Sequence, residues 1–283
     1  MADHRFEDGI QRGEVERAAR DLAYDDYIAA LLAPRASRPA LLTLAAVFGE
    51  LYRIPMQVSD AALGEIRLQW WRDAFARGAR TGHPVADAAL ALQPLLPLPL
   101  PLSAMIEPVI EARAAELYAE PFPGEAAFEA YVTAPAMAYF NLRAALLGSS
   151  DLMADPVAGK AARTIGLVRT CARLPQLIAK GRYPLPASRF DTTAASAGEI
   201  DEQDVRIACF GLLSEAATAW TALRPELQRV KPDLRRVVLP AALAGPYLRA
   251  MQHPGHNVLR DVADPSPLER MTRLWLAARF GRF

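Results

Sequence analysis

The sequence predicts an all-α fold, and three observations lead to this prediction. Apolar residues recur at three- and four-residue spacings along almost the whole chain, as in helices with one buried face. No segment shows the strict alternation of a half-buried strand, and no fixed-period repeat is present. With 283 residues, 52% of them apolar, the chain can build a substantial core. We therefore expect a single helical domain over 1–283, with 1–13 as a flexible N-terminal tail.

Prolines, small residues and a capping residue set the expected helix boundaries. Pro34 stops the first helix, and Pro39 suits the first turn of the second. Ser59 is a favourable N-cap for the third helix. Small residues at 134–136 favour a kink, and Pro175 bends or ends a later helix. The expected helices cover 14–32, 39–55, 60–78, 102–118, 125–148, 155–180, 200–221, 237–251 and 267–280, with a loop over 183–196.

The most apolar window, residues 88–106, carries no charge and nearly has the length of a membrane span. It contains Pro94, Pro97, Pro99 and Pro101. Because these prolines remove helix hydrogen bonds that lipid cannot replace, we expect no transmembrane helix here. The end of a helix followed by an extended connection is expected instead. The charged N-terminus lacks the apolar stretch of a secretory signal, which predicts a cytoplasmic location.

Composition and motif content exclude several classes of function. Lys plus Arg equals Asp plus Glu, 32 each, so there is no overall charge to attract nucleic acid. Cys171 and Cys209 form no CxxC pair and have no neighbouring histidine, which predicts free thiols rather than a zinc site. The sequence contains no GxSxG, no Walker loop and no GxGxxG. We expect no metal site and no cofactor.

The first expected helix contains two adjacent aspartates, Asp25 and Asp26. Adjacent side chains on a helix point about 100° apart. This spacing favours a solvated helix face over a metal site.

Three segments carry a resemblance to a known family. They read LGEIRLQWWRDA at 63–74, IEARAAELYAEPFP at 110–123, and Leu-Pro followed by GRYPLP within 174–186. With the closing RLWLAARFGRF, they resemble the squalene/phytoene synthase family over roughly 21–278. The similarity is greatest to a divergent branch that includes the mitochondrial complex I assembly factor of this family and its bacterial relatives. The resemblance implies an all-α isoprenoid-synthase fold around a central cavity.

The family's two aspartate-rich motifs do not occur in this sequence. In the active enzymes these motifs hold Mg²⁺ against a diphosphate, and carboxylates are the ligands this ion requires. The positions that match the first motif hold Arg53, Ile54 and Gln57. The second motif should lie between Gly166 and Arg182, but the interval contains no carboxylate and is about one helical turn short. The resemblance therefore implies a pseudoenzyme with no catalytic residue.

The remaining candidate residues are contacts of a cavity or a ligand. Arg67 and Trp71 share a helix face, as do Arg169 and Arg173, which lie on the helix that would have held the second motif. A basic cavity could take an anionic head group without metal. A core tryptophan and surface ion pairs are the alternatives that stay open. The candidates are Glu50, Arg53, Arg67, Trp71, Glu111, Glu116, Tyr139, Arg169, Arg173 and Arg182.

Three functions are consistent with the sequence. The leading hypothesis is a non-catalytic assembly or interaction factor, with subunits or assembly intermediates of respiratory complex I as partners. The first alternative is a head-to-head prenyl-diphosphate transferase that binds Mg²⁺ through displaced ligands such as Glu50, Glu111 and Glu116. The second alternative is a protein that binds an isoprenoid or lipid without converting it. A peripheral contact with the inner face of the membrane is expected, and nucleic acid is not an expected partner.

Overall fold

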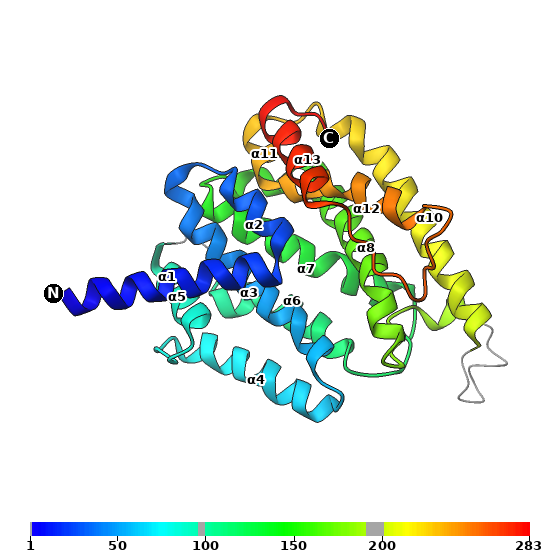
Figure 1. Cartoon of the computed structure of the whole chain (residues 1–283), viewed down its shortest axis with the longest axis horizontal. Coiled ribbons are helices and arrows are strands. Elements are labelled where there is room, and N and C mark those ends of the chain that lie inside the picture. The colour runs from blue at the N-terminus through cyan, green and yellow to red at the C-terminus, as the bar shows by residue number, and fades with distance from the viewer. Residues whose placement is uncertain (1, 96–99, 191–200) are drawn as a thin grey trace.

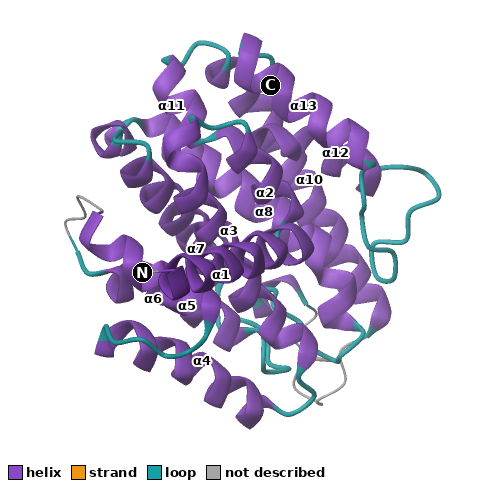
Figure 2. Ribbon diagram, turned by 60° about the vertical axis from the view of Figure 1, so that its left-hand side comes forward, coloured by secondary structure: helices purple, strands orange, loops and turns teal. Residues whose placement is uncertain are grey.

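The computed structural model describes residues 2–95, 100–190 and 201–283, and every regular element in these ranges is a helix (Figures 1 and 2). The all-α prediction is confirmed. Side chains are described from Arg12 onward, except at Leu95. The α-helices are α1 (Ala2–Leu22), α2 (Tyr24–Leu31), α3 (Arg38–Gln57), α4 (Ala61–Arg77), α5 (Pro84–Leu92), α6 (Leu102–Ala115), α7 (Glu125–Leu146), α8 (Pro156–Ile178), α10 (Glu202–Leu227), α11 (Pro232–Val237), α12 (Ala244–Met251) and α13 (Pro267–Phe280). Short 3-10 turns are η1 (Arg35–Ser37), η2 (Gln93–Leu95), η3 (Ser150–Ala154), η4 (Ala187–Arg189) and η5 (Leu239–Leu243).

The N-terminal segment differs from its prediction in two ways. Helix α1 begins at Ala2, so residues 2–13 continue a helix where a tail was expected. The single helix predicted over 14–32 is broken at Ala23, whose backbone leaves the helical region at φ −144°. A side chain at Gly49 would lie 2.7 Å from Leu22 Cβ, so α3 packs against the end of α1 at this break. The break therefore depends on a contact between helices, for which the local sequence has no signal.

Other boundaries agree with the prediction or shift by a few residues. Helix α13 has its predicted bounds, and the N-cap of α4 is Asp60 rather than Ser59. Helix α10 begins at Glu202 and continues to Leu227, six residues beyond the predicted end at 221. The predicted helix 237–251 is divided between η5 and α12. Part of the proline-rich connection and of the loop over 183–196 lies outside the described residues.

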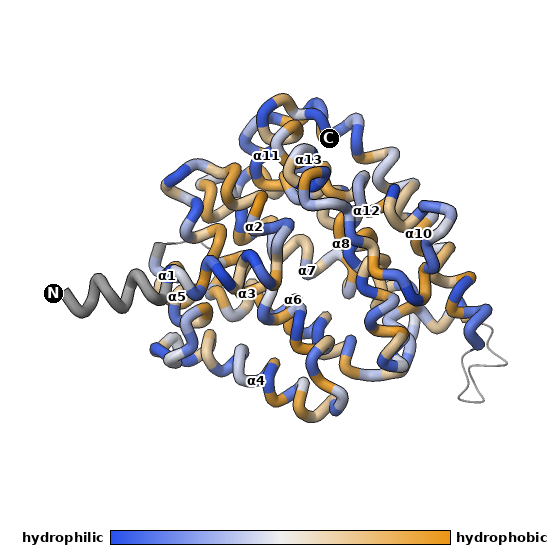
Figure 3. Tube along the Cα trace, viewed as in Figure 1, coloured by the Kyte–Doolittle hydropathy of each residue, from blue (hydrophilic) through white to orange (hydrophobic). Residues whose placement is uncertain are grey.

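Helices α7 and α8 pack closely against each other in the core. A Cβ atom at Gly166 of α8 would lie 2.1 Å from the carbonyl oxygen of Val132 on α7, so only glycine fits there. Most helices carry both hydrophilic and hydrophobic residues along their length (Figure 3). No helix among the described residues combines the length and apolar character needed to cross a membrane.

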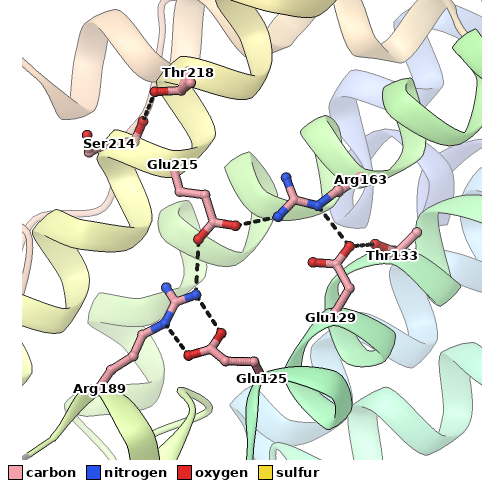
Figure 4. A network of polar contacts seen from close by, with 8 residues as sticks. All are labelled: Glu125, Glu129, Thr133, Arg163, Arg189, Ser214, Glu215 and Thr218. Atoms are coloured by element: carbon pink, nitrogen blue, oxygen red, sulfur yellow. Dashed lines mark hydrogen bonds and ion pairs between the residues drawn. The ribbon is translucent and has the colours of Figure 1, made fainter.

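A network of ion pairs connects α8 and the following turn η4 with α7 and α10 (Figure 4). Arg189 of η4 binds Glu125 of α7 at 2.8 Å and Glu215 of α10 at 3.0 Å. Arg163 of α8 binds Glu129 of α7 at 2.9 Å and also contacts Glu215. Because these side chains are partly exposed, we expect each ion pair to contribute little to stability.

Candidate functional site

A cavity of about 330 Å³ lies between the end of α1 and α2, α3, α8, η5, α12 and α13. Apolar side chains of α3, α8 and η5 form part of its wall, including Phe48, Val168 and Leu243. Several charged and polar side chains from helices far apart in the sequence also face it. They are Asp25, Asp26, Arg169, Arg173, Tyr247 and Arg270.

Two arginines one turn apart form the α8 wall of this cavity. Arg169 donates from Nη2 to Asp26 Oδ1 at 2.7 Å, and its guanidinium lies 5.7 Å from the ring centre of Tyr139. Burial alone would lower the pKa of Arg169, but Asp26 and the neighbouring tyrosines raise it above its ordinary value. Arg173 lies 5.0 Å from the ring centre of Tyr52 and donates to the Tyr52 carbonyl at 3.2 Å. The α8 wall therefore carries two fixed positive charges.

The interpretation of Asp25 and Asp26 as a solvated face is wrong. Asp26 is 6% exposed and pairs with Arg169. Asp25 accepts from the Tyr247 hydroxyl at 2.8 Å and pairs with Arg270 at 3.2 Å, while its burial raises its pKa. Both carboxylates line the cavity. Asp26 pairs there with Arg169 of α8, and Asp25 pairs with Arg270 of α13. Their partners lie more than a hundred residues away, so the local spacing could not reveal them.

Behind the cavity, Glu116 forms the centre of a buried cluster. Its carboxylate accepts from Tyr131 at 2.7 Å and from Arg173 at 2.6 Å, and Arg113 lies 3.1 Å away. Burial acts to raise the pKa of Glu116, but the two arginines outweigh it and hold that pKa below its ordinary value. Arg113 lies 4.0 Å from the ring centre of Tyr52, a cation–π contact. Glu116 and Arg173 were identified as candidates from the sequence, whereas Arg113 and Tyr131 were not.

The other candidate glutamates do not reach the cavity. Glu50 pairs with Arg53 at 2.9 Å, one helical turn away on α3. Arg53 is 40% exposed at its side chain, and Glu111 is exposed on α6. The structure therefore does not bring Glu50, Glu111 and Glu116 together.

Three further candidate residues make their contacts with the protein itself, away from the cavity. Arg67 is exposed, and its Nη1 lies 3.5 Å from Gln57 Oε1. Trp71 is 4% exposed and packs against the rings of Phe75 and His83. It is therefore a core tryptophan, which was one of the two alternatives left open by the sequence. Arg182 is buried and donates to the backbone oxygens of Pro55 at 2.6 Å and Val58 at 3.0 Å, so it caps the end of α3.

Tyr139 is the tenth candidate and is also buried. Its ring meets Phe48 edge-to-face with centroids 4.9 Å apart, and burial raises its pKa. It supports the cavity wall from behind Arg169.

The residues present do not fit a magnesium site of the carboxylate type. In this cavity α3 presents Tyr52 and α8 presents Arg169 and Arg173. Of the carboxylates that line it, Asp26 is already paired with Arg169 and Asp25 with Arg270. Arginine stays protonated at all accessible pH values and repels a divalent cation. No three His, Cys, Asp or Glu side chains in the described part of the chain are placed to share a metal ion.

Comparison with known proteins connects this architecture to a family. The family model described as squalene/phytoene synthase matches residues 19–270. A dehydrosqualene synthase crystal structure superposes with a TM-score of 0.70 at 15% identity, covering 96% of each chain. Squalene synthase HpnC from Alicyclobacillus acidocaldarius gives a TM-score of 0.63 at 17% identity, covering 87% of this chain and 95% of HpnC. A search of curated proteins finds no significant match. The chain thus has the isoprenoid-synthase fold of these enzymes, and it belongs to the squalene/phytoene synthase family.

Proposed function

We propose that this chain is a non-catalytic member of its family that acts as an assembly or interaction factor. One observation carries the proposal: Arg169 and Arg173 occupy the α8 wall opposite Tyr52 of α3. Prenyl transfer assisted by Mg²⁺ needs carboxylates on such facing helices, because the departing diphosphate must be neutralised by bound metal.

The arginines on the α8 wall are fixed in place by their own ion pairs. Arg169 is paired with Asp26 at 2.7 Å, and Arg173 is paired with Glu116 at 2.6 Å. Freeing Glu116 to bind a metal would leave the buried Arg113 without its counter-ion, which costs about 3–5 kcal/mol. The prenyltransferase hypothesis with displaced ligands therefore requires the core of the protein to rearrange.

We infer the partner from the resemblance of the sequence to the branch that includes the complex I assembly factor. We expect the chain to contact subunits or assembly intermediates of respiratory complex I. Deletion of the gene tests this directly, with NADH:quinone oxidoreductase activity measured beside carotenoid and hopanoid content. Loss of the first with the second unchanged supports assembly. Loss of isoprenoid products with normal NADH:quinone activity contradicts it.

The cavity itself favours binding of an isoprenoid or lipid as a second candidate function. Its wall combines apolar side chains such as Phe48 and Val168 with the guanidinium of Arg169, which suits an amphiphile with an anionic head group. Native mass spectrometry of the purified chain should then show a lipid in stoichiometric amount. An Arg169→Met variant that retains the same lipid at the same occupancy would contradict this assignment of the head-group site.

A further inference from the structure

Helix α13 turns a row of large apolar side chains toward solvent. Leu268, Met271 and Trp275 are 73%, 49% and 50% exposed, and Phe280 is 54% exposed. The first three recur at i, i+3 and i+7, so they form one face of the helix, which we term the α13 apolar stripe. The opposite face of α13 packs on η5, α2 and α11, and its residues Leu274 and Ala277 are fully buried there.

The surroundings of the α13 apolar stripe are basic. Residues 267–283 contain four arginines and one acidic residue, Glu269, which pairs with Arg249 of α12 at 2.5 Å. Arg279 and Arg282 are exposed at the end of the helix. Burial, and then the nearby Arg249 and Arg224, lower the pKa of Arg273. Arg270 is neutralised by Asp25 and Asp264, so the exposed cations beside the apolar side chains are Arg279 and Arg282.

A second exposed apolar row, on α4, has a smaller excess of basic residues around it. Leu63, Ile66 and Trp70 share a face of α4 at the same i, i+3, i+7 spacing, with exposures of 52%, 66% and 37%. Two of its three arginines are neutralised, since Arg72 pairs with Glu107 and Arg77 with Asp73. The third, Arg67, shares the helix with Glu65. Helices α4 and α13 lie on opposite sides of the molecule (Figures 1 and 2), so α4 provides a matched control.

We propose that the α13 apolar stripe docks on an anionic lipid bilayer. A helix lying in the plane of a membrane surface inserts apolar and tryptophan side chains while its arginines contact anionic head groups. Leu268, Met271 and Trp275 supply the first element, and Arg279 and Arg282 supply the second. This site is independent of whether the cavity binds or converts a ligand.

Vesicle co-sedimentation of the full chain tests the proposal. Wild-type protein should bind vesicles of equal parts phosphatidylcholine and phosphatidylglycerol, bind phosphatidylcholine vesicles at least about tenfold more weakly, and dissociate as salt is raised. Trp275→Glu should abolish binding, and Arg279→Ala with Arg282→Ala should weaken it by about tenfold or more. The control Ile66→Glu on α4 should bind like wild type. Circular dichroism of each variant verifies that the helices are retained.

Three results would overturn the proposal. The first is no binding of the wild-type chain to the anionic vesicles. The second is unchanged binding of Trp275→Glu, or loss of binding in Ile66→Glu. The third is a concentration-dependent dimer, seen by light scattering and removed by Trp275→Glu, in a chain that does not sediment with vesicles. That last outcome would assign the stripe to a second copy of the protein.

Discussion

The buried ion pairs of Glu116 allow us to predict how much the free energy of unfolding falls when its charge is removed. In Glu116→Gln the side chain keeps its shape but loses its negative charge. Arg113, 3% exposed at its side chain, then has no counter-ion, and Arg173 loses its closest one. Two further nitrogens of Arg113, Nε and Nη1, already have no hydrogen-bond partner among the described residues. Removing one partner of a buried ion pair costs about 3–5 kcal/mol.

Urea unfolding at neutral pH, followed by circular dichroism, measures this loss. The expected 3–5 kcal/mol corresponds to a fall of about 10 °C in Tm for a chain of this size. The matched control is Glu50→Gln, because the Glu50–Arg53 pair has a similar length but its arginine is 40% exposed. That control should cost less than about 1 kcal/mol.

The dependence on pH follows from the lowered pKa of Glu116. A carboxylate with a depressed folded-state pKa stabilises the protein above its unfolded-state value, about 4.3 for glutamate, and loses this effect as pH falls through the folded-state value. The difference in unfolding free energy between wild type and Glu116→Gln should therefore shrink below about pH 4. Equal stability of Glu116→Gln and Glu50→Gln at neutral pH would show instead that Arg113 needs no buried counter-ion.

Three further predictions, one of them with a control substitution, concern the packing of α7 on α8, the cap of α3 and the loop before α5. Gly166→Ala should cost about 3 kcal/mol because its methyl group meets the Val132 carbonyl, whereas Gly159→Ala on the same helix should be neutral or stabilising by up to about 1 kcal/mol. Arg182→Met should lower the unfolding free energy by about 2 kcal/mol through loss of its two bonds to carbonyl oxygens, as measured in urea. Burial acts to raise the pKa of Asp87, but hydrogen bonds from the preceding loop outweigh it and lower that pKa. Asp87→Asn should therefore be less stable than wild type at neutral pH, with the gap closing as pH falls below about 4; a gap that does not change with pH would contradict this.

Much of the fold could be predicted because local signals determine it. Helix α13 lies between Pro267 and Gly281, and α4 ends at Gly78, where the backbone adopts the left-handed conformation that glycine favours. The break at Ala23 could not be predicted in this way. It has no glycine or proline, and it depends on the close approach of Gly49 from another helix.

The candidate site was predicted in part, for a similar reason. Spacing alone placed Arg169 and Arg173 on one face of α8, and the structure shows both lining the cavity. The role of Asp26 depends on a partner 143 residues away, and Arg182 uses side-chain donors to cap carbonyls of a distant helix. Such pairings are set by the packing of helices, and neither composition nor periodicity encodes them.

The arginines that line the cavity lead us to propose that this chain does not support prenyl transfer assisted by Mg²⁺. The most direct test measures pyrophosphate release by the full chain from farnesyl or geranylgeranyl diphosphate with Mg²⁺, beside an active dehydrosqualene synthase as positive control. We expect pyrophosphate release no faster than in the absence of protein. Robust, saturable release that stops when the metal is chelated would contradict it.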